Sequence, residues 1–207
     1  MDVIKVEDRK IAMIILAAGE SKRLGAIKQN LPWKKTTLLG HAIEQGLSSI
    51  AEAVFVVLGS NAETIINEID QTKITIVKNS NWQKGMGTSI ACAMYYLHKK
   101  SLHFDAVLIA LIDQPLIDTI HYNNLIYSLF NNNINLIATQ INKRAGVPAI
   151  FASKYFTALS KLDKDYGARN ILRNNQNDIQ TLNIGDRIID IDTLEAYKYF
   201  YERYGKN

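Results

Sequence analysis

Four apolar runs constrain the fold of this chain more than any other feature of its sequence. They are dominated by Ile, Val, Leu and Ala, which is typical of strands that are buried on both faces of a sheet. Segments with apolar residues at helical spacing separate them, so strand and helix alternate. This alternation predicts an α/β fold, a Rossmann-like three-layer sandwich whose mostly parallel sheet carries helices on both faces. The runs are 11–19, 53–60, 73–79 and 105–115.

The other predicted elements follow from the same periodicities. Helices are expected over 36–50, 61–69 and 87–100, between the apolar runs. Beyond Pro115 the pattern is less regular. We expect there a helix over about 119–131, strands over 134–140 and 146–151, three short helices, and a strand followed by an amphipathic helix in 187–204.

Composition restricts the class of protein. The chain has 207 residues, of which 47% are hydrophobic, enough for one large domain with its own core. One cysteine, Cys92, excludes a disulfide framework, and the mixed charges of residues 1–10 make a poor signal peptide. No apolar run is long enough for a membrane span, so a cytoplasmic protein is expected. The net charge of +4 is scattered, which disfavours nucleic acid and favours solubility or a small anionic ligand.

The first apolar run opens into a loop that carries glycine and basic residues. It reads "LAAGESKRLGAIK" over 16–28, with Gly19 at the end of the run and Arg23 and Lys28 close behind. Gly19 can adopt a positive φ, the loop can offer N–H groups to an anion, and the basic side chains can add charge. The spacing is that of neither a P-loop nor a G-x-G-x-x-G dinucleotide motif. A phosphate loop and an ordinary turn with solvated basic side chains are equally compatible with these residues.

Two acidic positions stand where predicted strands end. Asp113 closes the run "LIALIDQP", and burying a carboxylate there is costly unless it is paired or bound to metal. It could hold Mg²⁺ against a phosphate, or initiate the turn before Pro115. In "IIDIDTLEA", Asp190 and Asp192 share one strand face if the strand continues, and Asp192 also suits the N-cap of the last helix, with Glu195 completing a capping box.

The segment "NSNWQKGMGTSIACAM" over 79–94 places two glycines before a helix. This pattern predicts a tight loop close to a flat or anionic group, with Thr88 or Ser89 capping the helix; a plain glycine hinge is the alternative. Cys92 is expected on the buried face of that helix. The four histidines show no metal-binding spacing and are expected to be structural or solvated.

Six motifs in order resemble the MobA-like nucleotidyltransferases of the molybdenum cofactor cytidylyltransferase type. The family pattern L-A-A-G-x-S-x-R-[ML]-G-x-x-K is matched by "LAAGESKRLGAIK". The other family patterns are matched by "NSNWQKGMGTS", "DQP", "GVPAIF", "GARNIL" and "DIDT". Each match is weak alone, but together they extend over nearly the whole chain.

The resemblance implies an enzyme, a single nucleotidyltransferase domain over 1–207 with a nucleotide-binding half (1–117) and an acceptor-binding half (118–207). The implied reaction is Mg²⁺-dependent transfer of CMP from CTP to the molybdopterin cofactor, with release of pyrophosphate. A molybdenum hydroxylase is the implied partner, with neither nucleic acid nor membrane. Relatives that use GTP tend to have Leu-Ala-Gly-Gly at the start, so "LAAG" favours cytidine. A GTP-dependent guanylyltransferase, a sugar- or polyol-phosphate nucleotidyltransferase and a non-catalytic cofactor-delivery protein remain alternatives.

The resemblance also implies roles for individual residues. Lys28, Arg23 and Asp113 would be catalytic, and Asp113 and Asp192 would hold the metal, with Asp190 replacing Asp192 if the strand register turns it inward. The implied nucleotide-binding residues are Leu16, Ala17, Ala18, Gly19, Arg23, Lys28, Asn79, Gly85, Gly87, Thr88 and Ser89. The implied acceptor-binding residues are Gly146, Pro148, Gly167 and Arg169.

Overall fold

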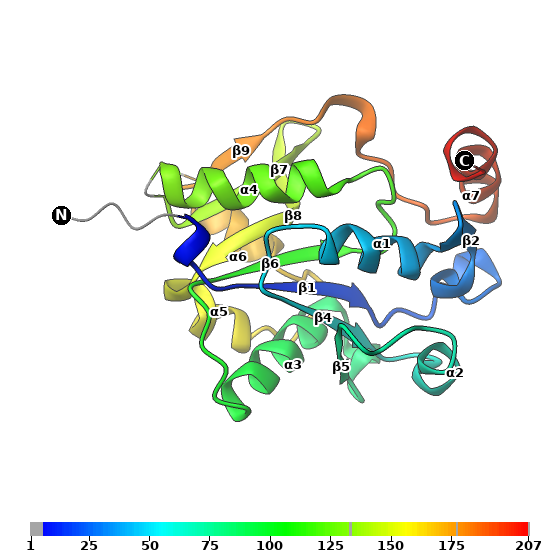
Figure 1. Ribbon diagram of the computed structural model, residues 1–207, viewed down its shortest axis with the longest axis horizontal. Helices are drawn as coiled ribbons and strands as arrows, with labels where there is room; N and C mark the ends of the chain where they lie inside the picture. Colours follow the sequence, from blue (N-terminus) through cyan, green and yellow to red (C-terminus); the bar gives the residue numbers. More distant parts are fainter. Residues whose placement is uncertain (1–5, 133, 177, 207) are drawn as a thin grey trace.

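A computed structural model of the chain describes residues 6–132, 134–176 and 178–206 (Figure 1). The segment predicted not to be a signal peptide, 1–10, therefore lies partly outside the described residues. Between the longer elements there are short 3₁₀ turns, which include η2 (Lys22–Leu24), η3 (Lys28–Asn30) and η4 (Trp82–Lys84). None of the helices in the described ranges is both long and apolar enough to cross a lipid bilayer.

A seven-stranded sheet forms the centre of the molecule, in the order β5-β4-β1-β6-β8-β7-β9. The four strands from β5 to β6 are parallel, β8 is antiparallel to both β6 and β7, and β9 is parallel to β7. The predicted α/β class with a mostly parallel sheet is thus confirmed. The strands are β1 (Ile11–Ala17), β4 (Ala53–Leu58), β5 (Thr75–Lys78), β6 (Ala106–Leu111), β7 (Leu136–Ile141), β8 (Arg144–Ala152) and β9 (Gln180–Leu182), and a separate two-stranded ribbon joins β2 (Pro32–Trp33) and β3 (Thr36–Thr37).

Helices cover both faces of the sheet (Figure 1). Side chains of β1 alternate between the faces: Met13 and Ile15 join one apolar cluster, and Ile14 and Leu16 join the other. The first cluster is completed by α1 (Leu38–Leu47), α2 (Ala62–Ile66) and α4 (Thr119–Asn131), and the second by α3 (Met86–Lys99), α5 (Phe156–Ser160) and α6 (Arg169–Asn174). Because both faces of β1 are covered, all of its side chains are buried and the strand is apolar throughout.

The order of the strands reverses next to β1. The connection through α1 leads from β1 to β4 on one side, whereas α3 leads from β5 to β6 on the other side of β1. In open parallel sheets a crevice forms at such a reversal, beyond the carboxyl ends of the strands. The segments that follow β1 and β6 begin at Ala18 and Ile112 and therefore face the crevice.

The strand predicted within 187–204 is wrong. The chain after the 3₁₀ turn η6 (Gly185–Arg187) is irregular up to α7 (Leu194–Phe200), which continues into a π-helical turn over Tyr201–Gly205. The apolar residue that suggested a strand, Ile191, is buried beside Leu24 and Trp33 instead of entering the sheet. The cap was also misplaced: Thr193 accepts the hydrogen bond from the N–H of Ala196, and Asp192 is left available for other contacts.

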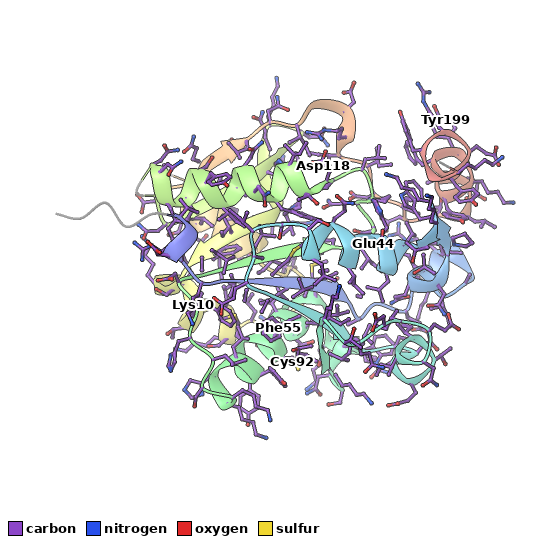
Figure 2. The ribbon with its side chains drawn as sticks, in the orientation of Figure 1. Lys10, Glu44, Phe55, Cys92, Asp118 and Tyr199 are labelled. Atoms are coloured by element: carbon purple, nitrogen blue, oxygen red, sulfur yellow. The ribbon has the colours of Figure 1, made fainter. Side chains whose placement is uncertain are left out.

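The half-buried Cys92 corrects the prediction of a core cysteine. It packs against the apolar cluster that contains Phe55, on the face covered by α3 (Figure 2). Its thiol also lies 3.5 Å from the carbonyl oxygen of Lys78, so the side chain sits at the margin of the cluster.

His121 is buried in α4, and its burial makes the stability of the fold sensitive to acid. Its Nε2 lies 2.7 Å from the hydroxyl of Thr139, which in turn donates to the carbonyl of Pro148, so Nε2 carries the proton and donates to Thr139. Burial, together with the charge of Arg187, lowers the pKa of His121 to about 4, while Asp118 opposes the shift. The unfolded chain therefore binds a proton at His121 below about pH 6.5, whereas the folded protein does so only near pH 4. The stability that comes from keeping His121 neutral is complete above pH 6.5 and is lost as the pH falls toward 4.

We expect the free energy of unfolding to fall by about 2 kcal/mol between pH 7 and pH 4.5 through this histidine alone. Urea unfolding at several pH values measures it, with His121→Gln as the comparison because glutamine does not titrate. The same pH dependence in both proteins would contradict the assignment.

Candidate active site

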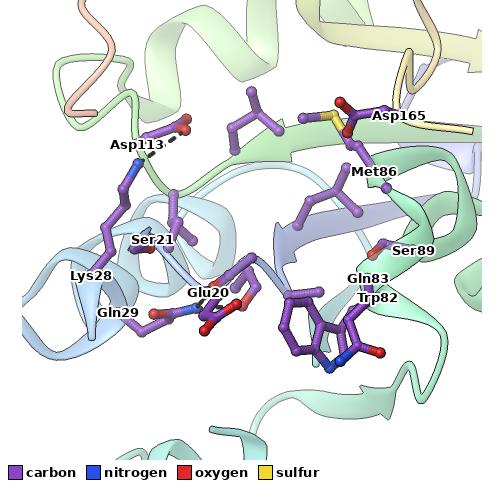
Figure 3. Close-up of a pocket in the computed structure, with 17 residues that line it drawn as sticks. Glu20, Ser21, Lys28, Gln29, Trp82, Gln83, Met86, Ser89, Asp113 and Asp165 are labelled. Carbon is purple, nitrogen blue, oxygen red and sulfur yellow. Dashed lines mark hydrogen bonds and ion pairs between the residues drawn. The ribbon is translucent and has the colours of Figure 1, made fainter. Parts of the chain in front are cut away.

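A cavity of about 300 Å³ opens in the crevice at the carboxyl ends of β1 and β6 (Figure 3). Seven of the eleven residues expected to bind nucleotide line it: Leu16, Ala17, Ala18, Gly19, Lys28, Gly85 and Ser89. Asp113 lines it as well. The other lining residues are Glu20, Ser21, Gln29, Trp82, Gln83, Met86, Leu111, Ile112 and Asp165. Lys28 and Asp113 stand together at one end of the cavity, and Trp82 and Met86 lie away from them (Figure 3).

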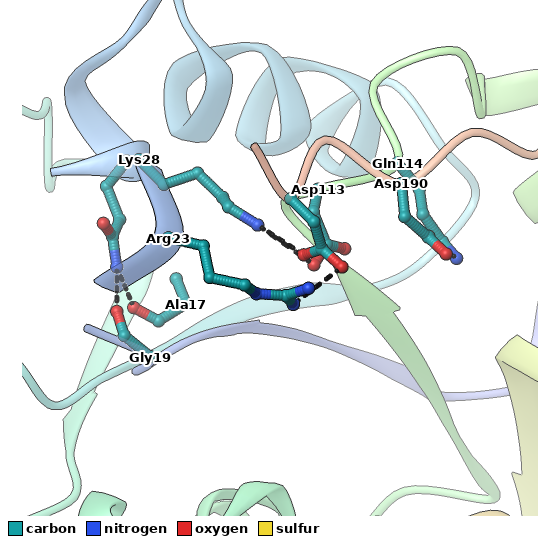
Figure 4. A network of polar contacts seen from close by, with 9 residues as sticks. Ala17, Gly19, Arg23, Lys28, Asp113, Gln114 and Asp190 are labelled. Atoms are coloured by element: carbon teal, nitrogen blue, oxygen red, sulfur yellow. Dashed lines mark hydrogen bonds and ion pairs between the residues drawn. The ribbon is translucent and has the colours of Figure 1, made fainter. Parts of the chain in front are cut away.

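Lys28 joins the two carboxylates that were expected to converge. Its Nζ lies 3.4 Å from Oδ2 of Asp113 and 3.2 Å from Oδ1 of Asp192, and its side chain is only 8% exposed (Figure 4). Arg23 reaches the same group from the loop after β1, with Nη2 3.0 Å from Oδ2 of Asp192. Two cations and two anions from three distant parts of the chain therefore meet at one edge of the cavity.

Asp113 carries the least satisfied charge of this cluster. Its Oδ1 is buried and has no hydrogen-bond partner among the described residues. Burial raises the pKa of the Asp113 carboxyl above its usual range; Lys28 offsets part of the rise, whereas Asp190 and Asp192 add to it. A further cation beside this carboxylate would stabilise its ionised form.

Asp190 and Asp192 face different partners. Asp192 contacts Lys28 and Arg23, whereas Asp190 accepts a hydrogen bond from Nε2 of Gln114 at 3.0 Å. Between them the N–H of Ile191 donates to the carbonyl of Asp113 at 2.8 Å. These bonds clamp the irregular segment onto the end of β6 and direct Asp192 toward the cavity edge.

The loop after β1 is shaped by residues other than the predicted glycine. Ser21 and Gly25 adopt positive φ values of 58° and 67°, and Gly19 does not. Gly19 instead leaves open space, because a Cβ built there would meet no atom within 4 Å. Gln29, a residue that the sequence did not single out, donates to the carbonyls of Ala17 and Gly19 and ties the loop to η3.

The start of α3 forms the opposite wall of the cavity. Ser89 reaches the cavity, whereas Asn79 lies behind it and donates to the hydroxyls of Thr88 and Ser89, each at 3.0 Å. The cap predicted at Thr88 or Ser89 is wrong, because the helix already begins at Met86 with Gly85 at the cap position. Asn79, Gly87, Thr88 and Arg23 do not line the cavity.

Gly85 is required by a close approach of the two halves of the chain. Its φ is 109°, and a Cβ there would stand 2.4 Å from the α-carbon of Asp165. The N–H of Gly87 donates to the carbonyl of Lys164 at 2.8 Å in the same contact. The segment around Asp165 thus packs directly on the start of α3 and contributes a carboxylate to the cavity.

None of the four predicted acceptor residues lines the cavity. Gly167 contacts Met86, which does line it, and Arg169 is exposed at the start of α6. Gly146 and Pro148 lie on β8, where antiparallel pairing places Ala149 opposite Ile109. In this register Gly146 and Pro148 lie beside the carboxyl-terminal end of β6, which leads to Asp113.

The residues at this site are suited to binding a nucleotide phosphate together with a divalent cation. Among the residues that the structure describes, no three His, Cys, Asp or Glu side chains gather into a metal cluster. Mg²⁺ does not need one, since it binds through one or two carboxylates and completes its shell with phosphate oxygens and water. The unpartnered Oδ1 of Asp113, close to Asp192, fits that mode of binding.

A loop with basic side chains and two carboxylates at the reversal point of a doubly wound sheet can bind the phosphates of a nucleotide, and together with the matching family this site indicates a nucleotidyltransferase. The chain belongs to the family of MobA-like NTP transferase domains, whose family model matches residues 13–179. The class and the family that the sequence motifs implied are therefore confirmed.

Two curated relatives differ in name. The chain is 30% identical over 191 residues to the nicotine blue oxidoreductase of Paenarthrobacter nicotinovorans, an alignment that covers 88% of this chain and 92% of the relative. It is 33% identical over 84 residues to the molybdenum cofactor cytidylyltransferase of Escherichia coli K12, which covers 41% of this chain and 44% of that enzyme.

Solved structures share the fold. The crystal structure of Rv0371c from Mycobacterium tuberculosis H37Rv superposes with a TM-score of 0.83 at 23% identity, covering 94% of this chain and 98% of the other. A second structure, of Rv0371c in complex with manganese, superposes with a TM-score of 0.79 at 20% identity and the same coverage.

Proposed function

We propose that this nucleotidyltransferase transfers CMP from CTP to a molybdopterin-type acceptor and releases pyrophosphate. The observation that supports it best is Lys28, held between Asp113 and Asp192 at the edge of a cavity of about 300 Å³. The local similarity to a molybdenum cofactor cytidylyltransferase supports the choice of acceptor, and "LAAG" supports cytidine. A molybdenum hydroxylase would receive the product.

The proposed reaction needs positioned charge more than a strong base. A phosphate oxygen of the acceptor attacks the α-phosphorus of CTP, the bond from that phosphorus to the β-phosphate oxygen breaks, and pyrophosphate leaves with its electron pair. Because the attacking oxygen is already anionic, no proton has to be removed. Lys28 and Arg23 leave their carboxylate partners and contact the phosphates, where charge builds up on the leaving group.

Asp113 and Asp192 would hold the divalent cation, whose charge neutralises the reacting phosphates and brings acceptor and nucleotide together. The backbone carbonyl of Asp113 accepts a hydrogen bond from the N–H of Ile191, which holds the segment that carries Asp192 next to Asp113. The acceptor would approach from β8, which carries Gly146 and Pro148, and from the segment around Asp165, where Gly167 contacts Met86 of the cavity wall. The exposed Arg169 would bind an anionic group of the acceptor.

We expect CTP to stabilise the fold more than GTP at equal concentration in the presence of Mg²⁺. A ligand that binds only the folded protein raises its stability in proportion to the logarithm of ligand concentration over Kd. At 100 times Kd the gain is about 2.7 kcal/mol, which thermal unfolding measures as a clear rise in Tm. A larger rise with GTP would contradict the choice of base and favour a guanylyltransferase, and a larger rise with UTP would favour sugar activation.

Redox chemistry is a second candidate function, favoured by the 30% identity to the nicotine blue oxidoreductase over most of the chain. The two candidates differ in products. Nucleotidyl transfer consumes CTP and releases one pyrophosphate for each acceptor modified, whereas electron transfer releases none. A pyrophosphate assay with CTP, Mg²⁺ and the molybdopterin cofactor therefore separates them.

A further inference from the structure

The carboxamide of Gln29 is committed to the backbone of the loop after β1. Gln29 is 2% exposed, and its Nε2 donates to the carbonyl of Ala17 at 2.6 Å and to the carbonyl of Gly19 at 3.2 Å. Both amide hydrogens are thereby used within the protein. The intervening carbonyl, that of Ala18, is held by a different element, because it accepts from the N–H of Ser60 at 3.0 Å.

These bonds fix the orientation of the peptide group that joins Gly19 to Glu20. A trans peptide is planar, so its C=O and N–H point in opposite directions. Since Gln29 holds the Gly19 carbonyl, the N–H of Glu20 is turned away from Gln29. Within the described residues this N–H donates no hydrogen bond, and Glu20 lines the cavity. A backbone donor is therefore held available where an anion can reach it.

We propose that Gln29 is a positioning residue that aims the N–H of Glu20 at the triphosphate. The inference rests on the proposed function, because it assumes that the cavity takes a nucleoside triphosphate. Glutamine is suited to the task because one nitrogen can donate twice at the required reach, whereas an ionised glutamate could only accept and would repel both carbonyls. Lys28 and Gln29 are neighbours in η3, so one turn places a charge at the cluster and braces the loop.

The variant Gln29→Met tests this, since methionine matches glutamine in length and lacks donors. We expect the Kd for CTP to rise about tenfold, the magnitude of one hydrogen bond to a charged group, while the Kd for cytidine changes less than about twofold. The matched control is Gln71→Met, because the exposed Gln71 also donates to a backbone carbonyl, that of Ile66 at 3.0 Å, away from the cavity. It should bind both ligands as the wild type does.

Weakening CTP and cytidine equally would show that Gln29 only maintains the shape of the cavity, and would overturn the proposal, as would unchanged affinity for CTP. A wild-type protein that binds cytidine no more weakly than CTP would overturn the proposed function itself. Should Gln29→Met fail to fold, nuclear magnetic resonance of the ¹⁵N-labelled wild type decides: the Glu20 amide proton should shift downfield with CTP and stay in place with cytidine. A shift of equal size with both ligands would overturn the proposal.

Discussion

Lys28→Ala is expected to lower turnover by about 10²–10³-fold, the usual effect of removing one group that stabilises charge in a transition state. Lys28 is the single side chain that contacts both Asp113 and Asp192 among the described residues, and its Nζ already stands at the edge of the cavity. In the proposed reaction it neutralises the leaving pyrophosphate. Steady-state pyrophosphate release measures the loss, and circular dichroism checks that the variant is folded.

The matched control is Lys22→Ala, in the same loop. Lys22 is 79% exposed and pairs with Glu20 at 3.3 Å, away from the carboxylates that Lys28 contacts. Its activity should stay close to that of the wild type. Full activity in Lys28→Ala would remove the lysine from the reaction, and an equal loss in both variants would point to a general effect of charge in the loop.

Asp113→Asn is expected to reduce kcat by about 10³-fold while the Kd for the nucleotide changes only a few fold. The charge of the carboxylate, and the cation that it would hold, act mainly on charge that develops in the transition state. The buried, unpartnered Oδ1 marks this as the carboxylate oxygen with most to gain from a metal. Single-turnover rates and nucleotide titration, made at several Mn²⁺ concentrations, separate the two effects.

Asp190→Asn makes the same chemical change on the neighbouring carboxylate. The asparagine introduced there would keep an oxygen that accepts from Gln114, so the kcat of this variant should fall far less than that of Asp113→Asn. A large loss of kcat in Asp190→Asn, together with weaker Mn²⁺ binding, would assign the second metal-binding carboxylate to Asp190 and contradict the role given to Asp192.

The sheet could be predicted from the sequence because burial on both faces leaves a direct trace. Met13 and Ile14 pack on opposite faces of β1, so both had to be apolar, and the run was visible without any partner strand. One member of the charged cluster was predictable for a related reason. Asp113 ends an apolar run and therefore stands out, whereas the predicted roles of Lys28 and Asp192 came from the family motifs.

The rest depended on contacts that no local pattern encodes. Ile191 has the apolar character of a strand residue, yet it packs beside Trp33, so the strand predicted there does not form. Gln29 is an ordinary polar residue in sequence, and its role emerges only when the loop folds back over it. Trp82 and Asp165 could not be assigned to the cavity either, since Asp165 reaches it through the contact of its backbone with Gly85.

The sequence distance across the charged cluster has a consequence for biosynthesis. Lys28 and Asp192 are 164 residues apart, whereas β1, β4, β5 and β6 are complete by Leu111. A nascent chain can therefore pair four parallel strands and expose the crevice while Asp192 is still inside the ribosome. Until then Asp113 is the carboxylate available to Lys28, and Arg23 lacks its partner Asp192. Contacts of such long range form late and slowly, so the charge arrangement of the site is assembled last, after most of the core is in place.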